Sequence, residues 1–118
     1  MSVRGLLQWQ WSDYSAKHRS RPNLLIHIVA VPLFQIGCLG AACGVFRLSW
    51  RAAALGIACV IVSFVLQGRG HRLEAEAPAP FAGPGDVVRR LMAEQWITFP
   101  RFVFSGGWYR NLQGGRHG

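Results

Sequence analysis

Three histidines and one glutamate could together form a metal site in this chain. His18 and His27 lie around the start of one long apolar segment, and His71 follows the end of a second. Residues three apart share a helical face, so Glu74 would lie beside His71 if the helix continues through Gly70. Three imidazoles and a carboxylate bind divalent transition metals, and this donor set suits non-haem Fe(II), with Zn or Mn as alternatives.

The spacing of the first two histidines requires a break between them. His18 and His27 are nine residues apart, half a turn out of phase on a continuous helix, and Pro22 supplies the break that would let them meet. A histidine on an apolar face is more often a hydrogen-bonded core residue than a ligand, so the spacing leaves both interpretations open. Three polar residues could orient the imidazoles or a bound ligand: Tyr14, Asn23 and Gln67. The last of these could equally cap a helix end.

Two apolar segments could bring the histidines to one level. The first, residues 24–46, has no charged side chain and would form about 34 Å of helix, enough to cross a membrane. The second, residues 52–67, gives about 24 Å, and with Trp50 and Arg51 as interfacial anchors we expect a span over residues 50–67. The short connection between them forces an antiparallel hairpin, which carries all three histidines to the same membrane face.

Small residues near the turn indicate close contact between the two helices. Gly40 and Gly44 are spaced by four late in the first segment, and Ala52 and Gly56 open the second. Such spacing lets helix backbones approach each other inside a membrane. The alternative is that these small residues only reflect composition.

The charges favour a membrane protein over other classes. The 118 residues carry a net charge of +8, yet 51% are apolar and only 15% are charged, fewer than in a typical soluble domain. Most basic residues near the hairpin lie outside its loop, which predicts that both termini are cytoplasmic and, in a bacterium, that the membrane is the inner one. Nucleic-acid binding is disfavoured, because the arginines are spread around apolar spans instead of gathered in one stripe.

We expect an amphipathic helix on each side of the hairpin. Residues 2–20 carry a stripe at helical spacing: Val3, Leu7, Trp11, Tyr14 and His18. Pro22 should end that helix, and Asn23 can cap the next one. After a proline-rich connection, residues 86–104 form a second helix, kinked or ended by Pro100. It either lies in the lipid headgroups or packs on its own protein.

The second amphipathic helix has two predicted sides. One side consists of Val88, Leu91, Met92, Gln95, Trp96 and Phe99, and the other of Arg90, Glu94 and Arg101. The whole chain, residues 1–118, is thus predicted to be one all-α domain embedded in a membrane. It would be an antiparallel transmembrane hairpin flanked by N- and C-terminal amphipathic helices.

Two blocks of polar residues resemble one family of membrane proteins. The blocks are Tyr14-x3-His18-x4-Asn23-x3-His27-x4-Pro32 and Gln67-x2-Gly70-His71-x2-Glu74-x3-Pro78-Ala79. In this order they are similar to the signature blocks of the small membrane family that includes the fungal 2-hydroxy-fatty-acid dioxygenase. Residues 94–102 resemble its bacterial branch. In many relatives the glutamate stands four residues after the histidine, whereas here Glu74 stands three and Glu76 five residues after His71.

The resemblance implies Fe(II)-dependent α-oxidation of a 2-hydroxy fatty acid. In that reaction O2 is used to remove the carboxyl carbon and leave a chain one carbon shorter. The resemblance also implies iron ligation by His18, His27 and His71. The acyl chain would lie in the membrane lipid with its carboxylate and 2-hydroxyl at the metal. Arg69 or Arg72 could pair with that carboxylate, or serve only as a topology determinant.

Two other functions stay open at this point. One is a non-catalytic membrane hairpin or scaffold, in which the histidines only serve as polar partners for one another and no stoichiometric metal is bound. The other is a zinc-binding membrane protein with a structural or hydrolytic site. No motif predicts an oligomeric state.

Overall fold

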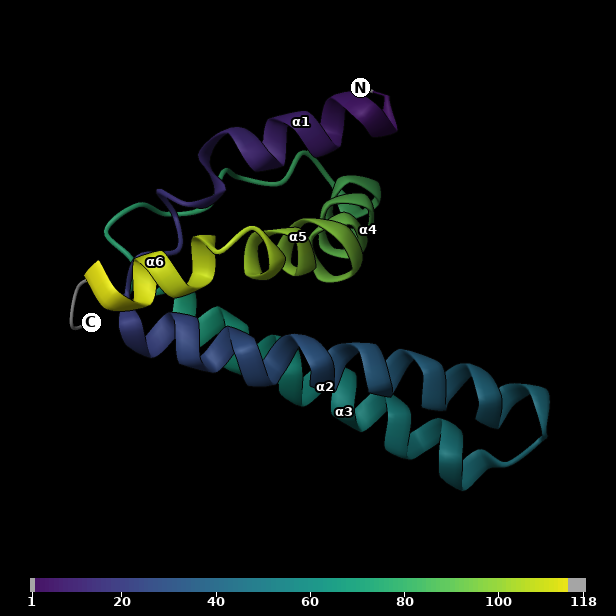
Figure 1. The fold of residues 1–118 in the computed structure, drawn as a ribbon. Coiled ribbons are helices and arrows are strands. Elements are labelled where there is room, and N and C mark those ends of the chain that lie inside the picture. The colour runs from purple at the N-terminus through teal and green to yellow at the C-terminus, as the bar shows by residue number, and fades with distance from the viewer. Residues whose placement is uncertain (1, 115–118) are drawn as a thin grey trace.

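The computed structural model describes residues 2–114, and every regular element in this range is a helix (Figure 1). The elements are α1 (Val3–Tyr14), α2 (Arg21–Phe46), α3 (Trp50–His71), α4 (Pro84–Ala93), the π-helix η1 (Glu94–Thr98), α5 (Phe99–Phe104) and α6 (Gly107–Gly114). The prediction of an all-α protein built on a hairpin with flanking helices is confirmed. The ends of the predicted domain, residues 1 and 115–118, lie outside the described residues.

Helices α2 and α3 form the antiparallel hairpin, and both are long and apolar enough to cross a membrane. Helix α2 begins at Arg21, three residues before the predicted start. Ser20 is its N-cap and accepts a hydrogen bond from the backbone N–H of Asn23 at 3.4 Å. Pro22 fits in the first turn, where a backbone N–H has no helical partner anyway. Asn23 is therefore not the cap, which corrects that prediction and leaves its side chain available for another role.

Glycines allow the two helices to touch near the turn. A Cβ on Gly37 would lie 2.7 Å from the carbonyl oxygen of Gly56, and a Cβ on Gly44 would overlap the backbone of Ala53. A Cβ on Gly40 would meet nothing closer than 3.9 Å, an ordinary contact. The predicted close packing of small residues is present, but Gly37 takes the place expected for Gly40.

The other helices cover one half of the hairpin. Helices α1, α4, α5 and α6 gather over the half that carries both of its chain ends, while the half near the turn extends beyond them (Figure 1). Helix α1 ends at Tyr14, six residues before the predicted end, and residues 15–17 form a turn. Helix α3 continues past the predicted residue 67 to His71. Its last turn therefore lies under the covering helices.

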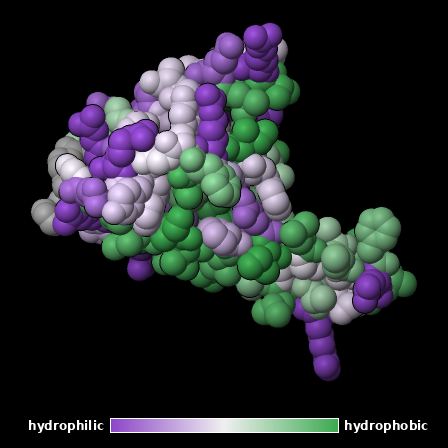
Figure 2. Space-filling view, in the orientation of Figure 1, coloured by the Kyte–Doolittle hydropathy of each residue, from purple (hydrophilic) through white to green (hydrophobic). Residues whose placement is uncertain are grey.

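The C-terminal helical segment packs on the hairpin by a different side from the one predicted. Gln95 and Phe99 are buried as expected of a packed side, but Arg90 is buried with them. Val88, Met92 and Trp96, which were predicted to share the side of Gln95 and Phe99, are exposed. Much of the hairpin surface is also apolar (Figure 2). An apolar surface turned outward on both parts is typical of a protein that contacts lipid.

Candidate metal centre

The hairpin brings His18, His27 and His71 into direct contact. The ring centroids of His18 lie 5.1 Å from those of His27 and His71, and the latter two are 4.9 Å apart. His27 comes from α2 and His71 from the last turn of α3, while His18 lies in the connection between α1 and α2. Each ring meets its neighbours edge to face. The antiparallel arrangement predicted from the apolar segments is what places them together.

Each imidazole turns an unpaired nitrogen inward. Nε2 of His18, Nε2 of His27 and Nδ1 of His71 are buried and have no hydrogen-bond partner among residues 2–114. Nδ1 of His18 lies 2.8 Å from the carbonyl oxygen of Tyr14, and Nδ1 of His27 lies 3.1 Å from that of Asn23. A carbonyl only accepts, so each Nδ1 carries the proton and each Nε2 offers a lone pair. A backbone carbonyl holding the far ring nitrogen is the usual support of a metal-binding histidine.

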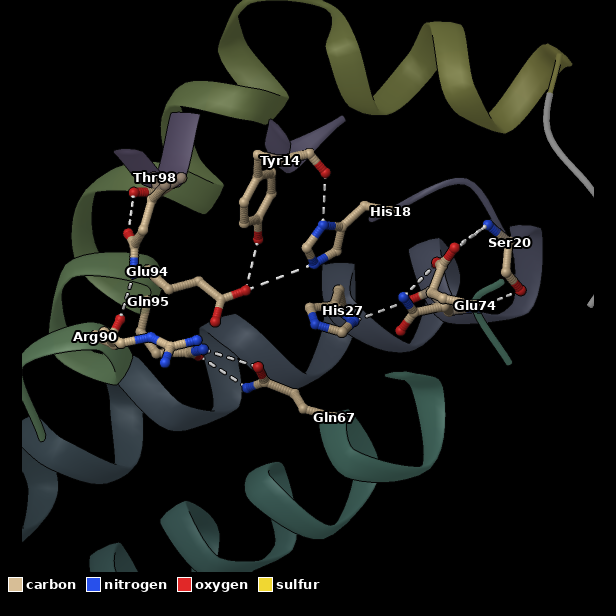
Figure 3. A network of polar contacts seen from close by, with 12 residues as sticks. Tyr14, His18, Ser20, His27, Gln67, Glu74, Arg90, Glu94, Gln95 and Thr98 are labelled. Atoms are coloured by element: carbon tan, nitrogen blue, oxygen red, sulfur yellow. Dashed lines mark hydrogen bonds and ion pairs between the residues drawn. The ribbon is translucent and has the colours of Figure 1, made fainter. Parts of the chain in front are cut away.

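Glu94 completes this group. One donor atom from each of His18, His27, His71 and Glu94 can be chosen so that all lie within 4.8 Å of one another. The carboxylate oxygen Oε2 of Glu94 is 3.6 Å from Nε2 of His18 and accepts a hydrogen bond from the Tyr14 hydroxyl at 2.8 Å (Figure 3). Buried donors that converge without hydrogen-bonding one another fit a divalent cation, because a buried polar group without a partner is otherwise costly.

The charge state of Glu94 suits a metal ligand. Burial on its own would raise the pKa of this carboxyl, but the adjacent imidazole of His18, and then those of His27 and His71, outweigh it and lower the pKa to about 2. Burial raises the pKa of the Tyr14 hydroxyl, and the Glu94 carboxylate raises it further. Glu94 is therefore ionised and Tyr14 protonated at neutral pH, so Tyr14 is the donor in their hydrogen bond.

Glu74 does not join the cluster, contrary to the prediction. Its carboxylate accepts hydrogen bonds from the backbone N–H groups of Arg19 at 2.9 Å and Ser20 at 3.1 Å. It also accepts one from the Asn23 side chain at 2.6 Å (Figure 3). The helix that should have carried Glu74 beside His71 ends at His71, and the chain then turns toward the start of α2. Glu74 holds Asn23, whose carbonyl in turn faces His27.

A π-helical turn positions Glu94. In this turn the N–H of Phe99 bonds to the carbonyl of Glu94, five residues back. The next carbonyl, that of Gln95, would need the N–H of residue 100, which is a proline. The side chain of Gln35 in α2 supplies the missing donor at 2.8 Å. Pro100 is thus accommodated without ending the helix, and the wider turn is fixed to the hairpin.

Gln67 supports the same turn from α3. Its side-chain amide and that of Gln95 exchange two hydrogen bonds of 2.8 Å, and both side chains are buried (Figure 3). Gln67 also donates to Ser63 at 3.0 Å. Of its two predicted roles, the structure favours orientation of the site over capping a helix end. Gly70 lies against Asn23, where any Cβ would overlap the Asn23 side chain.

A cavity of about 650 Å³ lies beside the cluster. His18, His71 and Glu94 form part of its wall. Arg72 also lines it, whereas Arg69 is not among its lining residues. The two arginines that the sequence left equivalent are therefore distinguished by position, since of the two only Arg72 lines the cavity.

The residues match one known family. The sequence profile of the family described as 2-hydroxy-palmitic acid dioxygenase Mpo1-like matches residues 6–102. The chain belongs to this family. The Mpo1-like region contains all four clustered donors and ends in α5, so α6 lies outside it. No curated protein matches the chain, and no solved structure matches it.

Sequence reasoning missed Glu94 as a member of the cluster. The amphipathic pattern put it on a polar side with Arg90 and Arg101, and a regular α-helix gives no reason to turn that side inward. Two signals were present in the sequence. Pro100 lies six residues later, and the polar residues Gln95 and Thr98 interrupt the apolar side. Together they are compatible with a π-turn, which is often found at functional sites.

Proposed function

We propose that this protein is an Fe(II)-dependent dioxygenase that shortens 2-hydroxy fatty acids by one carbon. The observation that carries the proposal is the convergence of one carboxylate and three buried imidazole nitrogens that have no hydrogen-bond partner within residues 2–114, beside a cavity whose wall includes His18, His71 and Glu94. The family to which the chain belongs is named for a 2-hydroxy-palmitic acid dioxygenase, which supports both the reaction class and the substrate class.

Three nitrogens and one carboxylate oxygen suit Fe(II), with Zn and Mn as alternatives. His18, His27, His71 and Glu94 would hold the ion. Bound iron would supply the redox chemistry by which O2 reacts with a closed-shell organic acid. Conversion of a 2-hydroxy acid and one O2 into the acid one carbon shorter, CO2 and water balances in atoms and electrons, so the reaction needs no further reductant.

The remaining residues of the site orient the donors and the substrate. The Tyr14 hydroxyl holds the Glu94 carboxylate, and Asn23, fixed by Glu74, holds the ring of His27. Arg72, on the cavity wall beside His71, would pair with the substrate carboxylate, since a guanidinium matches a carboxylate in charge and geometry. This would place the carboxyl and 2-hydroxyl groups next to the metal ligands.

The hairpin would place this chemistry at a membrane surface. Helices α2 and α3 would span the lipid with both chain termini on the cytoplasmic side, at the inner membrane if the organism is bacterial. The metal centre lies at the end of the hairpin that carries the termini, so it would face the cytoplasmic leaflet. Fatty acids are dissolved in that leaflet and would reach the site without leaving the lipid.

Two competing functions fit less well. A structural hairpin requires histidines that satisfy one another, but three of their nitrogens have no hydrogen-bond partner within residues 2–114. A closed zinc site is complete with four protein donors and has no position for substrate. This cluster opens onto a cavity, which favours a metal that takes further ligands beside the four donors.

The test is turnover of carboxyl-labelled 2-hydroxypalmitate by iron-loaded protein in lipid nanodiscs. We expect labelled CO2, the fatty acid one carbon shorter and one O2 consumed for each substrate. The variant His71→Ala should give none of these. Unchanged turnover in His71→Ala protein that holds no metal would overturn the proposal.

A further inference from the structure

The cavity beside the metal centre has a mostly apolar lining. It lies among α1, the last turns of α3, the connection after His71 and helix α4. Its apolar wall is formed mainly by Trp9, Phe64, Pro78, Ala79, Phe81 and Leu91. A volume of about 650 Å³ is within the range of sites that enclose a small organic molecule.

One face of α3 leads from the metal centre along the cavity toward the middle of the hairpin. Phe64, Gly68 and His71 lie on this face at helical spacing, and all three line the cavity. From His71 to Phe64 the helix rises about 10 Å. Neighbouring residues Ile61 and Val65 are exposed on a helix that is apolar enough to cross a membrane. If α3 crosses a membrane, the far end of the cavity would therefore lie at the depth of the acyl chains and its near end beside the clustered donors.

Charge fixes which end of an amphiphile would point to the metal. Three residues with permanently basic side chains line the cavity: Lys17, Arg72 and Arg90. Lys17 forms an ion pair of 2.9 Å with Asp13, and Arg90 forms one of 3.4 Å with Asp86, so both charges are already balanced. Arg72 is the cation left for a ligand acid. The polar head of a fatty acid would thus bind near Arg72, and its chain would run toward Phe64.

Gly68 keeps this path open. A Cβ built on Gly68 would meet no atom within 4 Å, although the residue lines the cavity from the last turn of α3. Glycine costs about 1 kcal/mol relative to alanine in a helix interior, and no close helix contact requires it here. Its neighbours at Phe64 and Gln67 carry large side chains. The missing side chain leaves room beside the helix for a ligand.

We propose that this cavity binds the acyl chain of a long-chain 2-hydroxy acid that enters from the membrane, and that Gly68 determines the chain length accepted. The identity of the head group rests on the function proposed above. The binding of the chain rests on the shape and apolar character of the cavity and on its position along α3.

The experiment compares Gly68→Leu with the matched control Gly85→Leu. A Cβ on Gly85, in the first turn of α4, also meets nothing within 4 Å, but Gly85 does not line the cavity. Turnover of 2-hydroxypalmitate and of 2-hydroxyhexanoate is measured for each iron-loaded protein, and the ratio of the two kcat/KM values is taken. A leucine that fills the path should lower this ratio at least about tenfold in Gly68→Leu. The ratio in Gly85→Leu should equal that of the wild type.

A binding measurement separates this inference from the proposed function. Palmitic acid, which lacks the 2-hydroxyl group, is titrated against each protein by displacement of a fluorescent fatty acid. The wild type could oxidise no 2-hydroxy acid and still bind palmitate. If Gly68→Leu then weakens palmitate binding at least about tenfold, the proposed dioxygenase reaction is wrong but the proposed acyl-chain site is supported. If the wild type is active and Gly68→Leu changes neither the palmitate affinity nor the chain-length ratio, the chain site is wrong.

Iron content serves as the control for folding. Gly68→Leu should bind iron in the same amount as Gly85→Leu, because the leucine is added on the cavity side of the helix and not at a metal ligand. A Gly68→Leu protein that folds, binds iron and retains the wild-type ratio overturns the proposal.

Discussion

Oε2 of Glu94 lies 3.6 Å from Nε2 of His18, close enough to share a cation but too far for a hydrogen bond. The same oxygen accepts a hydrogen bond from Tyr14, and the His18 nitrogen has no hydrogen-bond partner within residues 2–114. The two groups belong to segments far apart in the sequence. Their approach depends on the whole fold, since the hairpin, α1 and the π-turn must all be in place.

Matched substitutions can show which of two carboxylates, Glu94 or Glu74, binds the metal. Glu94→Gln removes a charge from the cluster, so we expect its iron affinity to fall at least about 100-fold. Glu74→Gln alters the contacts with Asn23 and with the backbone before α2 but leaves the four clustered donors unchanged, so it should change the affinity by no more than about tenfold. Competition with a chelator under anaerobic conditions measures both. Loss of iron in Glu74→Gln with retention in Glu94→Gln would reverse the assignment.

Tyr14 should act on iron binding through Glu94. The change Tyr14→Phe removes the 2.8 Å hydrogen bond to the carboxylate but keeps the ring that stacks on His18 at 3.9 Å. We expect iron affinity to fall about 10- to 100-fold, the usual effect of losing an outer partner of a ligand. Tyr109→Phe is the control, because Tyr109 is exposed and its hydroxyl accepts a hydrogen bond from Gln113, which is not one of the clustered donors. Equal iron affinities in the two variants would show that Tyr14 does not orient Glu94.

The π-turn should depend on Gln35. The change Gln35→Leu removes the side-chain donor to the Gln95 carbonyl, which Pro100 cannot replace. An unsatisfied buried carbonyl costs about 1–3 kcal/mol, so unfolding in detergent should occur at a lower denaturant concentration. The control is Gln8→Leu on the exposed side of α1, which should be nearly neutral. Identical midpoints for the two variants would contradict this account of the turn.

The contact between α2 and α3 should tolerate a methyl group at Gly40 but not at Gly56. A Cβ on Gly56 would overlap the backbone of Ala41, whereas one on Gly40 would make an ordinary contact of 3.9 Å. We expect Gly56→Ala to lower the free energy of unfolding by about 1–3 kcal/mol, a typical cost of overpacking. Gly40→Ala should be neutral or slightly stabilising. Titration with a denaturing detergent, followed by circular dichroism, provides the comparison.

Much of the fold could be predicted from the sequence because long apolar segments determine it. Two apolar segments of helical length, joined by a short charged connection, allow only an antiparallel hairpin. That hairpin by itself brings His27 and His71 to one end. Helix boundaries were less predictable. Pro22 was expected to lie before α2, but it fits within the first turn, and α3 continues to His71 through two glycines.

The carboxylate of the site could not be predicted from local spacing. Glu74 is near His71 in the sequence, but the helix ends between them and the carboxylate turns to the start of α2. Glu94 is far away in the sequence and belongs to an amphipathic segment whose polar side was not predicted to meet the histidines. It faces inward because Gln35, Gln67 and Gln95 fix a π-turn against the hairpin. This is a tertiary arrangement, and the spacing of apolar residues in the sequence does not predict it.

The central claim is that His18, His27, His71 and Glu94 hold a catalytic iron ion. The most direct measurement is elemental analysis of the protein purified anaerobically in lipid nanodiscs, with His71→Ala prepared in parallel. We predict about one iron per chain in the wild type and a large loss of iron in the variant, since removing one of the four donors weakens metal binding. Wild-type protein that folds but contains no transition metal, or an equal iron content in His71→Ala, would contradict the account.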